Sequence, residues 1–203
     1  MEQNIIRLTK KHIKQSGKVL GRAFCNDPVP IQVIPNDAER KVKIEYIFQM
    51  ITCLGIRYGE AHAISPNLEG IAIWIPFKTY EESFLRIFRC IFNTEVYKMR
   101  FEAQRRYKPI EKINKKLHLK YAPREHWYLQ TLGIDPPHQG KGHGSELLKF
   151  MLERIDKQGL PVYLETSTEK NVKFYEKFGF KLMEELIIPT TRMKEYFMLR
   201  ELH

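Results

Sequence analysis

Three glycines and a lysine precede a helix-like run in the segment "PHQGKGHGSELL", from Pro137 to Leu148. Glycine has no Cβ, so consecutive backbone N–H groups can point into one concave site. A helix that follows adds unpaired amides and the positive end of its dipole, and both attract anions. Lys141 adds a positive charge. The segment therefore predicts a binding site for a phosphate or pyrophosphate group.

Glycine spacing excludes two common phosphate-binding loops. A Walker loop has four residues between its glycines and then Lys-Ser/Thr, whereas six residues separate Gly133 from Gly140 and Lys141 is followed by Gly142. A dinucleotide fingerprint reads G-x-G-x-x-G in a first βαβ unit, and Ser145 stands where its third glycine belongs. Neither pattern fits this chain.

A third pattern, Q/R-x-x-G-x-G/A between a strand and a helix, fits Gln139, Gly142 and Gly144. Together with "NVKFYEKFGF" at Asn171 to Phe180 and the strand "YLETS" between them, it resembles the GNAT superfamily of acetyl-CoA-dependent N-acetyltransferases. More narrowly, "HWYLQTLGIDPPHQGKGHGSELL", "LETS" and "FYEKFGF" are similar to parts of the puromycin N-acetyltransferases. The resemblance implies a mixed, mostly antiparallel α/β sheet flanked by helices, the acyl-CoA N-acyltransferase fold.

The resemblance assigns a set of cofactor contacts. Backbone amides of the glycine loop would hold the pyrophosphate of acetyl-CoA, and main-chain groups of the preceding strand would pair with the pantetheine arm like an added strand. One of these amides would polarise the thioester carbonyl. The residues expected to contact acetyl-CoA are Leu132, Gly133, Ile134, Gln139, Gly140, Lys141, Gly142, His143, Gly144, Ser145, Asn171 and Tyr175. We also interpret Asn171 as a helix N-cap, a role compatible with the contact. No metal is expected.

Acetyl transfer to an amine needs a proton donor for the leaving thiolate. By the resemblance, Tyr175 takes this role, because a phenol with a pKa of about 10 is protonated at neutral pH and can donate to a thiolate whose conjugate acid has a pKa near 8.5. The alternative is a core aromatic residue beside Phe174, Phe178 and Phe180.

The reaction also needs a base that deprotonates the amine. We prefer Glu165, because a glutamate in the apolar strand "VYLETS" needs a partner or a function. His126 is the second candidate, since an imidazole titrates near neutral pH, and both residues could instead be structural. Trp74 and Tyr128 lie on strands that border the expected acceptor site, with the sheet core as the alternative.

Composition bounds the class of protein. The 203 residues, 43% hydrophobic and 29% charged, predict one soluble globular domain. The resemblance implies that residues 1–203 form a single GNAT-like domain, with an acceptor-shaping half of about 1–124 and an acetyl-CoA-binding half of about 125–203. The longest apolar stretch, "GIAIWIPF", is far shorter than the roughly 20 residues of a membrane-spanning helix. The N-terminus lacks the apolar region of a secretory signal, so we expect a cytoplasmic protein without a membrane partner.

The net charge of +10 favours an anionic partner. Nine Lys or Arg residues lie between Lys98 and Lys120, but a solvated helix face explains them better than a nucleic-acid partner. The resemblance implies an amine acceptor, and we expect the primary amine of a small molecule. The alternatives are a protein or peptide amine acetyltransferase and a non-catalytic acyl-CoA-binding or nucleic-acid-binding module. A homodimer is left open.

Hydrophobic periodicity places these residues on elements. In the N-terminal half it predicts a strand at "NIIRL", a helix capped by Thr9, a loop at "CNDPVPIQVIP" and a helix from Asn36 or Asp37 to Tyr58. The apolar stripe of that last helix would contain Val42, Tyr46, Met50 and Leu54. Strands "EAHAIS" and "GIAIWIPF" would pair antiparallel, followed by a helical region from Tyr80 to Leu119 that breaks near Pro109.

In the C-terminal half, the patterns predict a strand from His126 to Ile134 and a helix after the glycines. The apolar stripe of this helix would contain Leu147, Leu148, Met151, Leu152 and Ile155. A strand at "PVYLETS", a short helix ending at Gly179 and two final strands complete the chain.

Overall fold

The protein is described by a computed structural model that covers residues 4–80, 84–99 and 101–201. Seven strands form one sheet in the order β1-β2-β3-β4-β5-β7-β6. The strands are β1 (Ile6–Arg7), β2 (Glu60–Ala63), β3 (Gly70–Pro76), β4 (Trp127–Ile134), β5 (Val162–Thr166), β6 (Lys181–Ile187) and β7 (Lys194–Arg200). Among the strand pairs of the described residues, β4–β5 alone is parallel. The expected mixed, mostly antiparallel sheet is confirmed.

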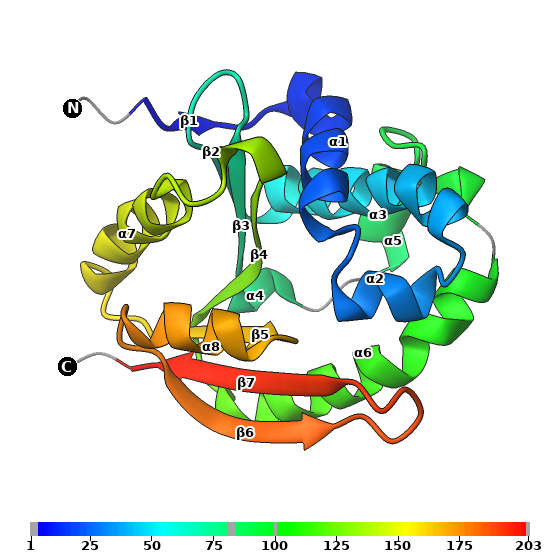
Figure 1. Ribbon diagram of the computed structural model, residues 1–203. Coiled ribbons are helices and arrows are strands. Elements are labelled where there is room, and N and C mark those ends of the chain that lie inside the picture. The colour runs from blue at the N-terminus through cyan, green and yellow to red at the C-terminus, as the bar shows by residue number, and fades with distance from the viewer. Residues whose placement is uncertain (1–3, 81–83, 100, 202–203) are drawn as a thin grey trace.

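Helices cover both faces of this sheet (Figure 1). They are α1 (Ile13–Phe24), α2 (Pro28–Val33), α3 (Asp37–Tyr58), α4 (Phe77–Tyr80), α5 (Phe84–Ile91), α6 (Phe101–Tyr121), α7 (His143–Asp156) and α8 (Glu169–Glu176), with short 3₁₀ turns at Lys10–His12, Val96–Lys98 and Pro136–His138. Helices α7 and α8 pack on β3 to β5 in the largest core cluster, whereas α1 and α3 pack on β2 and β3 in another. All five residues of the predicted α7 stripe are buried, as expected.

The two central strands separate part-way along their length. The β4–β5 ladder contains only the pairs Trp127–Val162 and Tyr128–Tyr163. Beyond it, β4 continues alongside β3 to Ile134, and β5 continues alongside β7. The facing edges of β4 and β5 are therefore released from each other in the second half of both strands.

A β-bulge marks the point of separation. Neighbouring residues Ile73 and Trp74 of β3 pair with Thr131 and Leu129 of β4, so Gln130 is an extra residue on β4. A bulge bends its strand and increases the local twist, which turns β4 away from β5.

The segment "CNDPVPIQVIP" is not a loop as predicted, because residues 28–33 form helix α2. Pro28 is the first helical residue, and Pro30 also lies in the first turn. Amides in a first turn have no partner within the helix, so proline costs no hydrogen bond there.

Two further predictions about the helices were wrong. The helical region does not break near Pro109, which lies inside α6; the interruption follows Ile91 instead. Ile110, next to the proline, is fully buried, and Leu117 is buried further along α6. Packing of these side chains holds the helix together across Pro109. Val42 is 55% exposed, because α3 buries the face that contains Ile44 and Phe48 against α1 and the sheet.

Candidate active site

The glycine loop lies between β4 and α7, and its backbone has the conformation that glycine permits. Gly140 and Gly142 have φ angles of +78° and +87°, in the left-handed region that side chains disfavour. A Cβ on either residue would meet nothing within 4 Å, so the loop leaves open space in front of it. Gly142 is the N-cap of α7 and provides no side-chain oxygen for the first amides of the helix. These amides are available to an anion.

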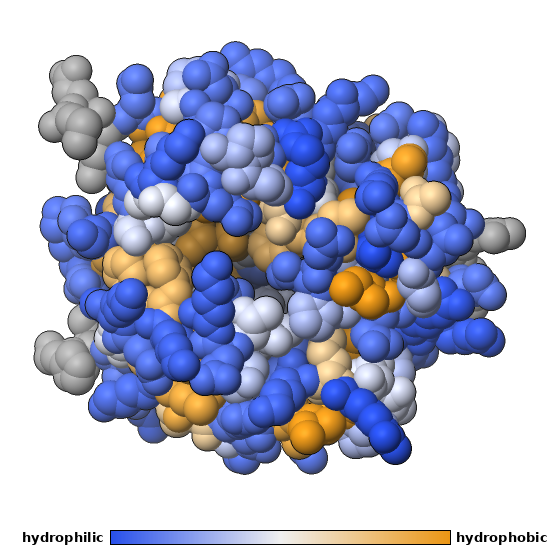
Figure 2. Space-filling view, in the orientation of Figure 1, coloured by the Kyte–Doolittle hydropathy of each residue, from blue (hydrophilic) through white to orange (hydrophobic). Residues whose placement is uncertain are grey.

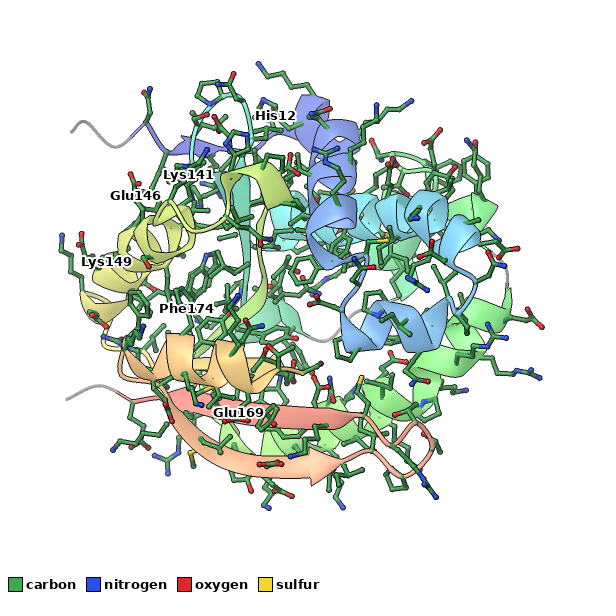
Figure 3. The ribbon with its side chains drawn as sticks, viewed as in Figure 1. His12, Lys141, Glu146, Lys149, Glu169 and Phe174 are labelled. Carbon is green, nitrogen blue, oxygen red and sulfur yellow. The ribbon has the colours of Figure 1, made fainter. Side chains whose placement is uncertain are left out.

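Two side chains extend this region (Figure 3). Lys141 is exposed at the start of α7, where it adds positive charge. Phe174 of α8 reaches the same end of α7, since its Cζ would lie 3.7 Å from a Cβ on Gly144. Figure 2 shows this face of the molecule hollowed over β4, between α7 and α1, with apolar side chains in the hollow. The loop, α8 and the free edge of β4 thus meet at one opening.

A cavity of about 200 Å³ lies on the α6 side of the same strands. Its lining residues are Leu54, Tyr58, Ile75, Thr79, Tyr80, Arg86, Tyr107, Glu111, Asn114, Lys115, Tyr128, Gln130 and Glu165. Gln130, the extra residue of the bulge, lines this cavity. Glu165, which lies beyond the end of the β4–β5 ladder, lines it as well. Tyr128 borders it as predicted, whereas Trp74 is fully buried in the core beside α7.

Glu165 is the buried acid of this cavity, with a side chain 6% exposed. The Tyr128 hydroxyl donates a hydrogen bond of 2.6 Å to its Oε2. Burial raises the pKa of Glu165 to about 7, the Tyr128 hydrogen bond opposes the rise, and the nearby Glu195 carboxylate adds to it. A carboxyl group with this pKa can take and release a proton near neutral pH.

Glu195 on β7 was not anticipated from the sequence. It is buried, and it accepts a hydrogen bond of 2.9 Å from the Ser167 hydroxyl. Burial raises the pKa of Glu195 to about 7, against hydrogen bonds from Ser167 and Asn114. Because Asn114 donates through its amide nitrogen, its Oδ1 is left for the cavity that it lines.

Tyr175 lies elsewhere, in the core cluster under α8, and it does not line the cavity of Glu165. It packs against Phe174 and Phe180, with ring centroids 5.2 and 5.6 Å away. Burial raises the pKa of Tyr175, and the negative charge of Asp27 raises it further, so the phenol stays protonated.

Asp27 is a second carboxyl group that the sequence did not point to. It precedes α2 but makes no side-chain cap, and burial raises its pKa to about 6. Its negative charge raises the pKa of Tyr175, although 148 positions separate the two residues in the chain.

Three further residues predicted for the site, Asn171, Gly133 and His126, lie in different parts of the fold. Asn171 is not the N-cap of α8, because Thr168 takes that role and accepts a bond from the Asn171 amide; the Asn171 side chain donates to the Thr166 hydroxyl at 3.0 Å. Gly133 faces α1, where a Cβ would lie 2.6 Å from Phe24. His126 is fully buried and does not line the cavity.

The sequence and the fold are similar to those of known proteins. Residues 102–180 match the Acetyltransferase (GNAT) family. An uncharacterised N-acetyltransferase of Schizosaccharomyces pombe is 27% identical over 194 residues, which cover 93% of this chain and 78% of that protein. An acetyltransferase of Corynebacterium glutamicum, described as histone acetyltransferase HPA2 and related acetyltransferase, has a TM-score of 0.67 at 20% identity, covering 100% of this chain and 98% of its own. The fold is that of the GNAT acyltransferases.

A further GNAT-fold structure, polyamine N-acetyltransferase of Drosophila melanogaster, has a TM-score of 0.59 at 10% identity and covers 98% of this chain and 99% of its own. The family match covers residues 102–180, and the solved structures show a shared fold. The narrower resemblance to puromycin N-acetyltransferases stays a prediction. Within the described ranges, no group of three His, Cys, Asp or Glu side chains could hold a metal. No helix in the same ranges has the length and apolar character needed to cross a membrane.

Proposed function

We propose that this protein transfers the acetyl group of acetyl-CoA to the primary amine of a small molecule. The separation of β4 from β5 supports this most, because it leaves an unpaired edge of β4 between the open glycine loop, which follows the strand, and Gln130 and Glu165, which line the cavity. A donor held along the free edge of β4 would then present its thioester to an amine in the cavity.

The residues present fit acetyl-CoA. The loop has open space where side chains would stand, and the first amides of α7 lack a capping side chain. Several such amides together with Lys141 would hold the pyrophosphate, since each helix-end contribution alone is only about 0.3–1 kcal/mol. Beyond Tyr128 the edge of β4 has no paired strand on the β5 side, so residues 132 and 133 offer main-chain groups to the pantetheine amides. The Ile134 carbonyl already accepts a hydrogen bond of 3.1 Å from Gln139 Nε2. When bound, acetyl-CoA supplies the acetyl group as a thioester.

The side chains would divide the proton transfers between them. Ionised Glu165 would take the proton of the acceptor ammonium, either directly or through a water molecule. Tyr175, held protonated by burial and by Asp27, would donate to the departing thiolate. One β4 amide would polarise the carbonyl of the thioester.

The cavity favours a compact, N–H-rich acceptor. Within the described ranges, Asn114 Oδ1, Gln130 Oε1 and Glu165 Oε1 are buried without a hydrogen-bond partner. All three atoms accept hydrogen bonds, and all three residues line the cavity. A primary ammonium group brings three donors, and about 200 Å³ admits a small molecule more readily than a peptide chain. The polyamine acetyltransferase of the same fold agrees with a small amine acceptor.

An amine screen tests the proposal. The protein is incubated with acetyl-CoA and with phenethylamine, tyramine, putrescine, puromycin or a short peptide with a free N-terminus, and free thiol is measured over time. We expect thiol release with at least one small amine and loss of that release in Glu165→Gln. Release with the peptide alone would replace the small-molecule acceptor by a peptide. Acetyl-CoA that binds but yields no thiol with any amine would leave a non-catalytic acyl-CoA-binding protein.

A further inference from the structure

Two buried histidines extend inward from the surface towards Glu165. His118 of α6 and His126, the residue before β4, are both fully buried. Their Nε2 atoms lie 2.6 Å apart, and His126 Nδ1 lies 2.6 Å from the carbonyl oxygen of Arg124. Arg124 is exposed, so this end of the chain of contacts lies near solvent.

The carbonyl fixes the direction of the hydrogen bonds. Because a carbonyl oxygen only accepts, His126 donates from Nδ1 and, as a neutral ring, accepts at Nε2. His118 must then donate from its Nε2, which leaves a lone pair on its Nδ1. Burial lowers the pKa of His118 to about 3, with His126 adding to the effect, and burial also lowers the pKa of His126. Both rings are therefore neutral at pH 7.

The lone pair of His118 faces the proposed base. His118 Nδ1 lies 3.9 Å from Glu165 Oε1. Among the described residues, neither atom has a hydrogen-bond partner. A movement of about 1 Å brings them to hydrogen-bond distance, and the O–H of protonated Glu165 then has an acceptor.

We propose that His118 and His126 form a proton relay that carries the proton taken up by Glu165 to the surface at Arg124. The relay rests on the proposed function. An acceptor that enters as an ammonium ion gives R–NH₃⁺ + acetyl-S-CoA → amide + CoA-SH + H⁺. Glu165 receives the surplus proton and passes it to His118 Nδ1; the Nε2 proton of His118 moves to His126 Nε2, and the Nδ1 proton of His126 leaves to water at the exposed Arg124 end. Both rings then return to their starting tautomers, with His126 protonated on Nδ1 and His118 on Nε2, before the next turnover. Glu165 is ionised again while donor and acceptor still close the cavity.

The aromatic rings that pack on the two histidines are uncharged, whereas Arg86, Glu111 and Lys115 line the cavity that Glu165 also lines. The rings of Tyr80 and Tyr163 lie 3.8 and 4.2 Å from the His118 ring, and Tyr128 lies 4.9 Å away. Phe77 packs on the His126 ring at 5.0 Å. Glu195 of β7 acts on the pKa of Glu165 from the far side.

Two acceptors of similar shape but different basicity test whether His118 and His126 transfer a proton or only pack in the core. We use phenethylamine, which is an ammonium ion at pH 7.5, and its β,β-difluoro analogue, whose nitrogen is much less basic. A neutral amine releases no surplus proton, because its own proton ends on the thiolate. With phenethylamine, we expect His126→Gln and His118→Gln to lower kcat about tenfold or more and to leave KM unchanged. With the fluorinated analogue, we expect the same variants to lower kcat by less than about threefold. Phe77→Leu, which alters only packing on His126, should not distinguish the two amines.

The outcomes are separable. Equal losses with both amines, or no loss, would overturn the relay while leaving the proposed function intact. No thiol release by the wild-type protein with either amine would overturn the proposed function for this acceptor class, and the relay with it. If the variants do not fold, nitrogen-15 NMR of the wild-type imidazoles decides: we expect neutral rings, with His126 protonated on Nδ1 and His118 on Nε2. The reverse tautomers or imidazolium ions would contradict the relay.

Discussion

The Tyr128 hydroxyl donates a 2.6 Å hydrogen bond to the Glu165 carboxylate, across the point where the central strands part. Tyr128 belongs to the last β4–β5 pair, and Glu165 lies on β5 just beyond it. The carboxylate is thus held at the corner of the opening, with one oxygen bonded and the other turned to the cavity and to His118.

This arrangement predicts how activity depends on pH. Glu165 acts as a base only when ionised, and its pKa of about 7 places the rise of kcat near neutral pH. We expect Glu165→Gln to lower kcat about 10²–10⁴-fold and to remove this acidic limb. Activity that keeps the limb in the variant would show that another group is the base.

A substitution at Glu195 should shift the acidic limb of the kcat–pH profile without removing the base. Its charge raises the pKa of Glu165, so Glu195→Gln should move the acidic limb to lower pH without removing it. The Gln side chain still accepts from Ser167, which keeps that contact. A limb that does not move in kcat–pH profiles would contradict the coupling between the two acids.

Stability should depend on pH through Glu165 in the opposite direction to activity. The folded protein holds this proton with a pKa of about 7 against an ordinary 4.5, so the contribution is complete below pH 4.5 and is lost as pH rises through 7. Glu165→Gln avoids that loss, which is on the order of 3 kcal/mol. In urea titrations, we expect the variant to gain stability relative to wild type at pH 8.5 but not at pH 4.5. A pH-independent difference would show that the carboxyl group titrates normally.

The glycine loop allows a test with a matched control. Gly142→Ala places a Cβ at a φ of +87°, which costs about 1–2 kcal/mol without any steric contact. A loop that relaxes away from this conformation should bind acetyl-CoA about tenfold more weakly in calorimetry.

Gly159 is the control, because it has a φ of +71°, equally open surroundings and a place at the far end of α7. Gly159→Ala should lower stability by a similar amount and leave the Kd for acetyl-CoA unchanged. Equal losses of affinity in both variants would mean that general destabilisation, and not the loop, governs binding.

Much of the fold could be predicted from hydrophobic periodicity and glycine spacing within short segments. The α7 stripe, the strand that became β4 and the positive-φ glycine loop all depend on neighbours within about ten positions, where periodicity and glycine spacing are informative. Pro109 and the segment of α2 misled the prediction, because burial of Ile110 and first-turn geometry override the usual effect of proline.

The site was only partly visible because its contacts join distant segments. Glu165 and Tyr128 were singled out, but nothing local indicates that His118 lies beside Glu165, 47 positions away. The bulge at Gln130 arises from pairing with β3, and the effect of Asp27 on the pKa of Tyr175 joins residues 148 positions apart. Such relationships exist only after the sheet has formed.

Amide hydrogen exchange resolved by NMR reports whether the glycine loop and the free edge of β4 bind acetyl-CoA. On addition of acetyl-CoA, we expect slower exchange at the amides of residues 141–145 and along β4 at residues 132–134, with Gly159 unaffected. Unchanged exchange in both segments at saturating acetyl-CoA would contradict the account.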